Sequence, residues 1–180
     1  MALLAGCESG TSAAPARPAH SVGMDQAFPE IEAASGFSVG KADARRVAYV
    51  FFDPQCPHCA TLWQSAWPVA ESGDARFIWI PVGMLSRASE PQGATILGAA
   101  DPIVAMHENE KLIHAGRGGI SADSAAHSKF GAKVKANTEL FNAFRAKQDG
   151  VPLLVSKVNG VLRKQSGSMP TAMLRGFLSL

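Results

Sequence analysis

The sequence has few charged residues, no long apolar run and only three cysteines. Charged residues make up 18% of its 180 residues, the formal net charge is +2, and the lysines and arginines are scattered. Nucleic-acid-binding proteins concentrate basic side chains on one surface, so nucleic acid is not expected as a partner. No run of 18 apolar residues occurs, which argues against a transmembrane helix. The apolar content of 47% is enough for the core of one domain.

The cysteines fall into two groups. Cys7 lies in a biased N-terminal segment, whereas Cys56 and Cys59 form a C-x-x-C pair inside an apolar stretch. One local pair is too few for a disulfide scaffold, which leaves a redox pair or half of a metal site. A zinc site would need two further ligands, and the remaining histidines are dispersed. We therefore expect no metal and no bound cofactor. These histidines are expected at the surface: His20, His107, His114 and His127.

Residues 1–22 are interpreted as a signal remnant and tether. Leu4-Ala5-Gly6-Cys7 resembles the lipobox of bacterial lipoproteins, in which the cysteine is acylated after signal cleavage, and residues 8–22 have the composition of a flexible tether. Only five residues precede Gly6, without a basic n-region. Either the true start lies upstream or the match is chance. Acylation at Cys7 would anchor the protein to a membrane in an oxidising, extracytoplasmic compartment.

A βαβ unit is predicted around the C-x-x-C pair. Residues 47–52 are continuously apolar and β-prone, as in a strand covered on both faces. Cys56 then stands at a helix N-cap and Pro57 at the first helical position, where its fixed φ suits a helix start. A second strand is expected at residues 76–82. The pair therefore lies at the first strand-to-helix turn.

The remaining elements complete an α/β order. Residues 83–149 are predicted to be mainly helical, with Asp101-Pro102 starting one helix. Asn159-Gly160 indicates a two-residue hairpin. Two strands and a last helix are expected at residues 152–158, 161–165 and 168–178. The order βαβ, helical insertion, ββα is that of a thioredoxin fold, so residues 23–180 are predicted to form one catalytic domain.

The spacing of the pair suits thiol–disulfide exchange. At the N-cap, the Cys56 sulfur is expected to reach solvent and attack, while Cys59, one turn further in, resolves the mixed disulfide. Unpaired N–H groups and the helix dipole favour a thiolate on Cys56 and so lower its pKa. We expect His58 to stabilise this thiolate further, which makes the disulfide a stronger oxidant.

The residues around the pair resemble a known family. The octapeptide Phe52–Cys59, the following Leu62-Trp63 and a strand ending in Pro81-Val82-Gly83 are similar to the catalytic domain of the DsbC/DsbG thiol–disulfide interchange family, most of all its DsbG branch. The resemblance runs from about residue 36 to residue 180. It implies a periplasmic protein that exchanges, isomerises or reduces oxidised cysteines of client proteins, with a membrane redox partner that resets the pair.

The same resemblance implies a second site element. Gly150-Val151-Pro152, just before a strand, matches the family's cis-proline loop. Pro152 is then expected to be cis and Val151 to present its backbone to the substrate; alternatively, Pro152 merely opens a strand. The family usually has Thr before this proline and Tyr inside the C-x-x-C. Val151 and His58 instead resemble DsbA, the disulfide donor.

Two classes of function remain open. The first is a thiol–disulfide oxidoreductase whose direction, oxidase or reductase, is unresolved, with a DsbG-type isomerase or sulfenic-acid reductase as an alternative. The second is a thioredoxin-fold binding module or chaperone in which the cysteines are incidental. Fewer than 30 structured residues precede the catalytic strand, so we expect no N-terminal dimerisation domain and a monomer. Isomerisation, which uses that dimer, is therefore disfavoured.

Overall fold

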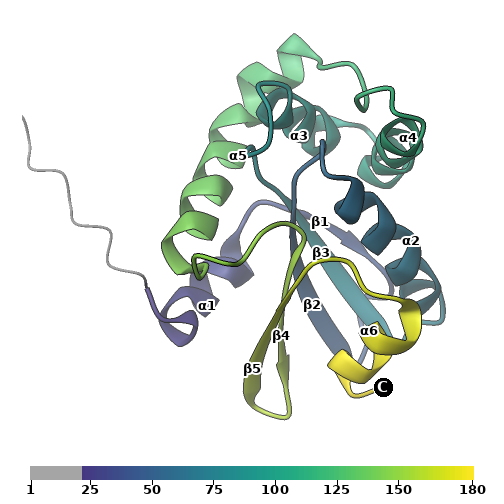
Figure 1. The fold of residues 1–180 in the computed structure, drawn as a ribbon, viewed down its shortest axis with the longest axis vertical. Helices are drawn as coiled ribbons and strands as arrows, with labels where there is room; N and C mark the ends of the chain where they lie inside the picture. The colour runs from purple at the N-terminus through teal and green to yellow at the C-terminus, as the bar shows by residue number, and fades with distance from the viewer. Residues whose placement is uncertain (1–21) are drawn as a thin grey trace, which may run out of the picture.

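A mixed five-stranded sheet organises residues 22–180, the part of the chain that this computed structural model describes (Figure 1). The strand order is β1-β3-β2-β4-β5; β2 and β3 are parallel and the other neighbours antiparallel. The strands are β1 (Phe37–Val39), β2 (Arg46–Phe52), β3 (Ala75–Pro81), β4 (Leu153–Val158) and β5 (Val161–Ser166). This architecture confirms the predicted thioredoxin-type α/β class.

Helices cover both faces of the sheet. They are α1 (Met24–Ala33), α2 (Pro57–Glu71), α3 (Ser89–Gly98), α4 (Pro102–His114), α5 (Ser124–Phe144) and α6 (Thr171–Leu178). In Figure 1, α1 and α5 lie on one side of the sheet and α2 and α6 on the other. The sequence analysis predicted no α1, because the N-cap residue of this helix, Gly23, offers no side-chain cap and the helix contains Pro29.

Side chains of the central strand β2 enter two apolar cores. Ala48, Val50 and Phe52 lie in the core that contains the buried face of α2, Cys56 and Cys59. Phe51 points the opposite way and packs on Phe141 of α5, with ring centroids 5.6 Å apart. This alternation is the period of two expected of a strand buried on both faces. The first turn of α2 thus follows a strand whose last three residues are buried.

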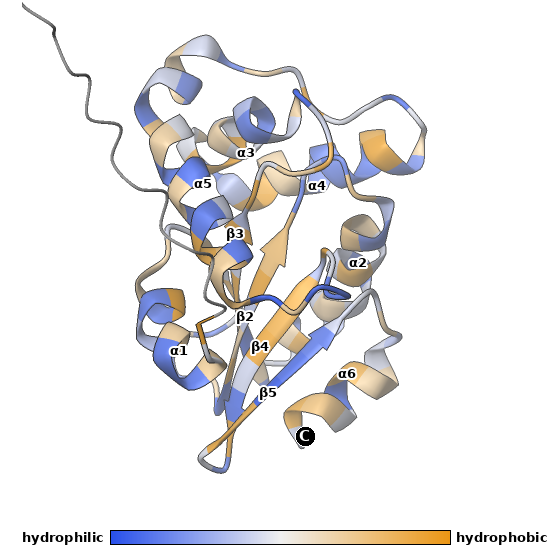
Figure 2. Ribbon diagram, turned by 60° about the vertical axis from the view of Figure 1, so that its left-hand side comes forward, coloured by the Kyte–Doolittle hydropathy of each residue, from blue (hydrophilic) through white to orange (hydrophobic). Residues whose placement is uncertain are grey.

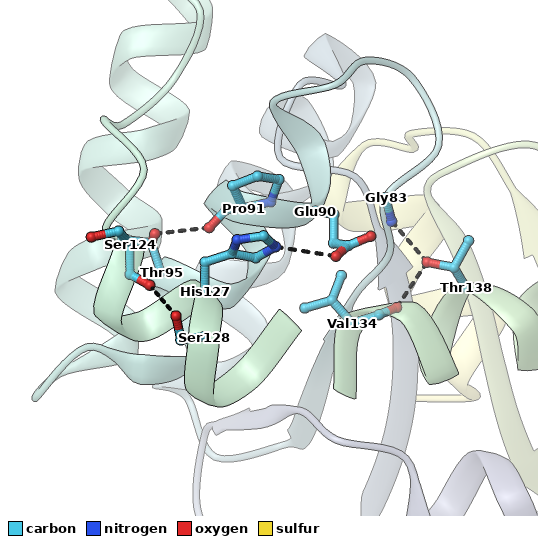
Figure 3. Close-up of polar contacts among 9 residues, drawn as sticks. All are labelled: Gly83, Glu90, Pro91, Thr95, Ser124, His127, Ser128, Val134 and Thr138. Carbon is cyan, nitrogen blue, oxygen red and sulfur yellow. Dashed lines mark hydrogen bonds and ion pairs between the residues drawn. The ribbon is translucent and has the colours of Figure 1, made fainter. Parts of the chain in front are cut away.

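Three helices lie between β3 and β4, and polar contacts fix them (Figure 3). Thr138 of α5 accepts a hydrogen bond from the N–H of Gly83 (2.9 Å), just after β3. His127 of α5 lies 3.2 Å from Glu90 of α3. Asp101 caps α4 and Asp123 caps α5 through their carboxylates. The Gly83–Thr138 bond also fixes the start of the segment that follows β3.

The C-terminal hairpin follows its turn sequence. Asn159 and Gly160 both have positive φ, 51° and 82°, as a two-residue hairpin requires. Strand β4 is coloured mostly hydrophobic and β5 mostly hydrophilic in Figure 2, because β5 is an edge strand with alternate exposed residues. In the described part of the chain, no helix has the length and apolar character needed to cross a membrane.

Candidate active site

Strand β2 and helix α2 together place Cys56. The chain leaves β2 at Phe52, and the N–H of Cys56 donates to the carbonyl of Asp53 (3.0 Å). Cys56 has φ −92° and ψ 113°, an extended N-cap conformation, and Pro57 occupies the first helical position. The carbonyl of Cys56 accepts from the N–H of Ala60 (3.2 Å), which is the first hydrogen bond of the helix. The structure therefore puts Cys56 at the positive end of the helix, as predicted.

The two cysteines are free thiols, and both are buried. Cys59 is completely buried, and Cys56 keeps only 4% of its surface exposed. The sequence analysis expected a more exposed Cys56, and the structure corrects this. The cause is the loop before β4: the Val151–Pro152 peptide bond is cis, and the Cys56 thiol donates to the Val151 carbonyl (3.4 Å). Val151 therefore lies directly over the first sulfur.

The surroundings of Cys56 favour its thiolate. The thiol of Cys59 hydrogen-bonds to the Cys56 sulfur and, with the backbone N–H groups of Cys59 and His58, lowers the pKa of Cys56 to about 7 against the opposing effect of burial. His58 thus lowers the pKa of Cys56 through its main-chain N–H, and the residue itself is exposed to solvent. The negative charge of Asp53 opposes the thiolate.

The surroundings of Cys59 raise its pKa instead. Burial, the hydrogen bond to Cys56 and the charges of Cys56 and Glu110 hold the pKa of Cys59 well above its usual value. Because one sulfur ionises near neutral pH and the other resists ionisation, the pair separates an attacking thiolate from a protonated partner.

Asp53 organises the loops beneath the pair. It is fully buried, and its carboxylate accepts from the N–H groups of Gln55 (2.8 Å), Met84 (2.7 Å) and Leu85 (2.9 Å). These bonds join the turn before Cys56 to the segment after β3. The sequence analysis gave Asp53 no role, because its partners at 84 and 85 follow a different strand.

Side-chain amides attach the helical insertion to the same turn. Gln55 donates to Gln92 (2.5 Å) and to the carbonyl of Gly118 (2.6 Å), and Gln92 donates to the carbonyls of Gly118 (2.8 Å) and Ile120 (2.7 Å). Gly119 has φ 79°, and a Cβ there would lie 2.6 Å from the side-chain oxygen of Asn109. The glycine-rich segment 116–119 therefore packs against the active-site turn.

Helix α4 adds two buried polar residues. Asn109 donates to the carbonyl of Pro54 (2.9 Å) and accepts from the N–H of Ile120 (3.1 Å). Glu110 is 3% exposed, and burial raises its pKa to about 8, with the charge of Cys56 adding to the effect. Neither residue was singled out from the sequence, since they lie about 50 positions after the pair in an apparently ordinary helix.

Aromatic rings pack along α2. The indole N–H of Trp63 donates to Nδ1 of His107 (3.0 Å), and the Trp63 and Trp79 rings meet edge to face with centroids 4.9 Å apart. His107 lies on the exposed surface, as expected, but it is tied to the active-site helix. Among residues 22–180, no group of three or more His, Cys, Asp or Glu side chains is arranged to hold a metal ion. Cys7 lies outside the described residues.

The fold and the thiol pair define the class of protein. A β-α-β unit with a dithiol at the start of its helix, opposite a cis-proline loop, is the arrangement of a thioredoxin-fold protein. A family model described as "Thioredoxin" matches residues 32–175. The chain belongs to the thioredoxin family, which confirms the fold predicted from the sequence.

Within that family the chain is similar to DsbG, as the sequence resemblance predicted. It is 36% identical over 84 residues to the thiol:disulfide interchange protein DsbG of Pseudomonas aeruginosa, covering 47% of this chain and 33% of that protein. It is 38% identical over 71 residues to DsbG of Escherichia coli, covering 39% of this chain and 29% of that protein. The matches thus span about a third of the relatives' length.

Solved structures share the fold. The catalytic domain of Proteus mirabilis ScsC has a TM-score of 0.63 at 18% identity, covering 86% of this chain and 96% of that one. The thiol-disulfide exchange protein α-DsbA2 of Wolbachia pipientis has a TM-score of 0.63 at 16% identity, covering 87% and 92%. A periplasmic thioredoxin-like protein of Salmonella enterica gives 0.58 at 16% identity, covering 83% and 94%.

Proposed function

We propose that this protein is a thiol–disulfide oxidoreductase that acts on cysteines of client proteins through Cys56 and Cys59. The observation that carries the proposal is that two thiols within one helical turn have pKa values shifted in opposite directions. The pKa of Cys56 is lowered to about 7, whereas that of the buried Cys59 is raised. Exchange needs such a pair: one sulfur must attack as a thiolate and the other must wait protonated.

The chemistry proceeds in two displacements. In reduction, the Cys56 thiolate attacks a client disulfide and releases one client thiolate. Cys59 then loses its proton and attacks the Cys56 sulfur, which forms the Cys56–Cys59 disulfide and releases the second client thiolate. Two electrons pass from the pair to the client. Oxidation of a client dithiol is the same sequence in reverse, and begins with attack of a client thiolate on the Cys56 sulfur.

Val151 and Pro152 are proposed to shape the client groove. The Val151 carbonyl already occupies the hydrogen-bonding position beside Cys56. A client segment that brings its sulfur to Cys56 must pass alongside this loop, where main-chain groups can pair with an extended chain. His58, one residue before Cys59, is exposed to solvent.

We also propose a periplasmic setting, with cysteine-containing clients and a membrane redox partner that resets the pair. The similarity to DsbG supports this setting, and the lipobox-like segment ending at Cys7 supports attachment to a membrane. A monomer remains our expectation for residues 23–180. Light scattering at micromolar concentration tests it, and a stable dimer would contradict it.

The test is insulin reduction by the wild-type protein and by Cys56→Ala. The proposal predicts catalysed reduction by wild type and none by the variant, with equal far-UV circular dichroism. Equal effects of both proteins on insulin aggregation would instead support a binding module. The resting redox state of the pair in cells then sets the direction: an oxidised pair indicates a donor, a reduced pair a reductase or isomerase.

A further inference from the structure

A pocket rich in basic side chains lies on the face of the sheet that α1 covers, opposite the helix that carries the thiols (Figure 1). Its volume is about 310 Å³, which is the size of a small-molecule site. We call it the basic pocket, and its polar and aromatic lining consists of Phe28, Glu32, Arg45, Tyr49, Arg76 and Lys157. The exchange steps described above use none of these residues.

The basic pocket is separate from the dithiol. Val47, which also lines it, stands near the start of β2 and pairs with Arg76 of β3. At about 3.3 Å per residue, the stretch of β2 from Val47 to Phe52 spans roughly 15 Å, and Cys56 follows beyond the end of the strand. A ligand in the pocket therefore leaves the sulfurs accessible to clients.

Positive charge in the basic pocket is not neutralised by the protein. Arg45, Arg76 and Lys157 form no salt bridge among residues 22–180. Within the same described part of the chain, Glu32 is the one carboxylate in the lining, so two positive charges are in excess. The Nε of Arg76 is buried and has no hydrogen-bond partner there. A buried donor in this state is stabilised when a ligand or an ordered water accepts its hydrogen bond.

Two aromatic rings form the other walls of the basic pocket. Phe28 of α1 meets Tyr49 of β2 edge to face, with ring centroids 5.8 Å apart, and the Nζ of Lys157 lies 5.9 Å from the centroid of the Phe28 ring. Burial and the charge of Glu32 raise the pKa of Tyr49, and the charge of Arg76 opposes them. The Tyr49 hydroxyl therefore stays protonated near neutral pH and can donate a hydrogen bond.

We propose that the basic pocket binds a phosphate ester, either a small soluble one or the headgroup of a phospholipid. A phosphate monoester carries about 1.5 to 2 negative charges near neutral pH and three acceptor oxygens, which match the charge excess and the donors of Arg76, Lys157 and Tyr49. A guanidinium group also fits phosphate oxygens with two parallel hydrogen bonds. The pocket is larger than a bare phosphate ion, so the organic part of the ester packs on the rings of Phe28 and Tyr49.

Binding measurements on the full chain test the proposal and distinguish the two sources of phosphate. Calorimetric titration with glycerol phosphate probes the soluble ester, and co-sedimentation with phosphatidylglycerol or phosphatidylcholine vesicles probes the lipid. Binding of glycerol phosphate supports a soluble ester. Binding of phosphatidylglycerol vesicles alone supports a headgroup. In either case Arg76→Gln and Lys157→Gln should each raise the Kd by about tenfold, because each loses a charged hydrogen bond. Binding of neither probe by the wild-type protein would overturn the proposal.

Arg87→Gln is the matched control, because it removes the same charge from an exposed arginine outside the basic pocket. Its Kd should equal that of wild type, and far-UV circular dichroism should be the same for all variants. An equal loss of affinity in Arg87→Gln would overturn the proposal, because net charge alone would then explain binding. Wild-type affinity in both pocket variants, or equal affinity of the wild-type protein for acetate and glycerol phosphate, would overturn it as well.

A second measurement needs no variant. In a nitrogen-15 NMR titration of the wild-type protein with the probe that binds, the amide signals of Val47, Arg76 and Lys157 should shift or broaden in a saturable way. The signals of Cys56 and Cys59 should stay in place, because the dithiol lies beyond the other end of β2. Changes confined to residues outside the basic pocket would overturn the proposal.

Discussion

The Cys56 thiol lies 3.4 Å from the main-chain carbonyl oxygen of Val151, 95 positions away in the sequence. This contact brings together the start of α2 and the loop before β4, the two parts of the candidate site. It also explains why Cys56 is only 4% exposed although it stands at a helix end. A client that reacts with Cys56 must therefore displace or pair with the Val151 loop.

Val151 should tune the redox potential through its side chain. Val151→Thr keeps the shape and adds a hydroxyl beside the sulfurs, and a hydroxyl that donates to the Cys56 thiolate stabilises the reduced form. A hydrogen bond to a charged group contributes about 1.5 kcal/mol or more, so the potential should rise by roughly 30 mV. Equilibration with glutathione measures it. Val161→Thr, at an exposed site on β5, is the control; an unchanged potential in Val151→Thr would contradict the placement of this loop.

The largest contribution to the low pKa of Cys56 is the hydrogen bond from the Cys59 thiol, and substitutions of Cys59 can test it. The Cys59 thiol donates to the Cys56 sulfur, and the hydroxyl of Cys59→Ser can replace that donor whereas the methyl of Cys59→Ala cannot. The pKa of Cys56 should therefore be higher in Cys59→Ala, by roughly one pH unit for a charged hydrogen bond. Thiolate absorbance against pH gives both values. Identical values would assign the low pKa to the helix N-terminus alone.

Asp53 should stabilise the fold at the expense of the thiolate. In Asp53→Asn, one oxygen can no longer accept from the N–H groups of Met84 and Leu85, so the free energy of unfolding should fall by about 2–4 kcal/mol. The pKa of Cys56 should fall as well, because the opposing charge of Asp53 is gone. Urea unfolding and thiolate absorbance test the two effects. A raised Cys56 pKa would show that the charge assignment is wrong.

The burial of Glu110 should be visible in stability against pH. The folded protein holds its proton up to about pH 8, whereas an unfolded chain releases it near 4.5. The folded state thus binds more protons between these values, so stability is greatest below pH 4.5 and declines as pH rises towards 8. The decline attributable to Glu110 is on the order of 4 kcal/mol. Urea titrations of reduced wild type and Glu110→Gln, from pH 4.5 to 8, should differ by this slope. Parallel curves would contradict it.

Local signals in the sequence were sufficient to predict the elements that carry the thiols. Pro57 after a buried strand marks the helix start, and Asn159-Gly160 marks the hairpin through its need for positive φ. Each signal lies within a few residues of the structure that it predicts, so no tertiary information is needed.

The supporting residues could not be predicted, because their roles arise from contacts between distant segments. Asp53 meets Met84 31 positions away, and Gln55 meets Gly118 63 positions away. Glu110 looks like any helical glutamate until the fold buries it. The cover over Cys56 likewise depends on how the Val151 loop docks, which the spacing of the cysteines does not specify.

The most direct test of the account is a non-reducing gel of cells that express Cys59→Ser or Cys56→Ser. Loss of Cys59 removes the neighbouring thiol that resolves the mixed disulfide, so Cys59→Ser should accumulate slower bands that vanish with reductant. Cys56→Ser should trap few clients, because Cys59 is completely buried and its raised pKa keeps it protonated. Equal trapping by both variants, or trapping by Cys56→Ser alone, would contradict the assignment of Cys56 as the attacking sulfur and Cys59 as the resolving one.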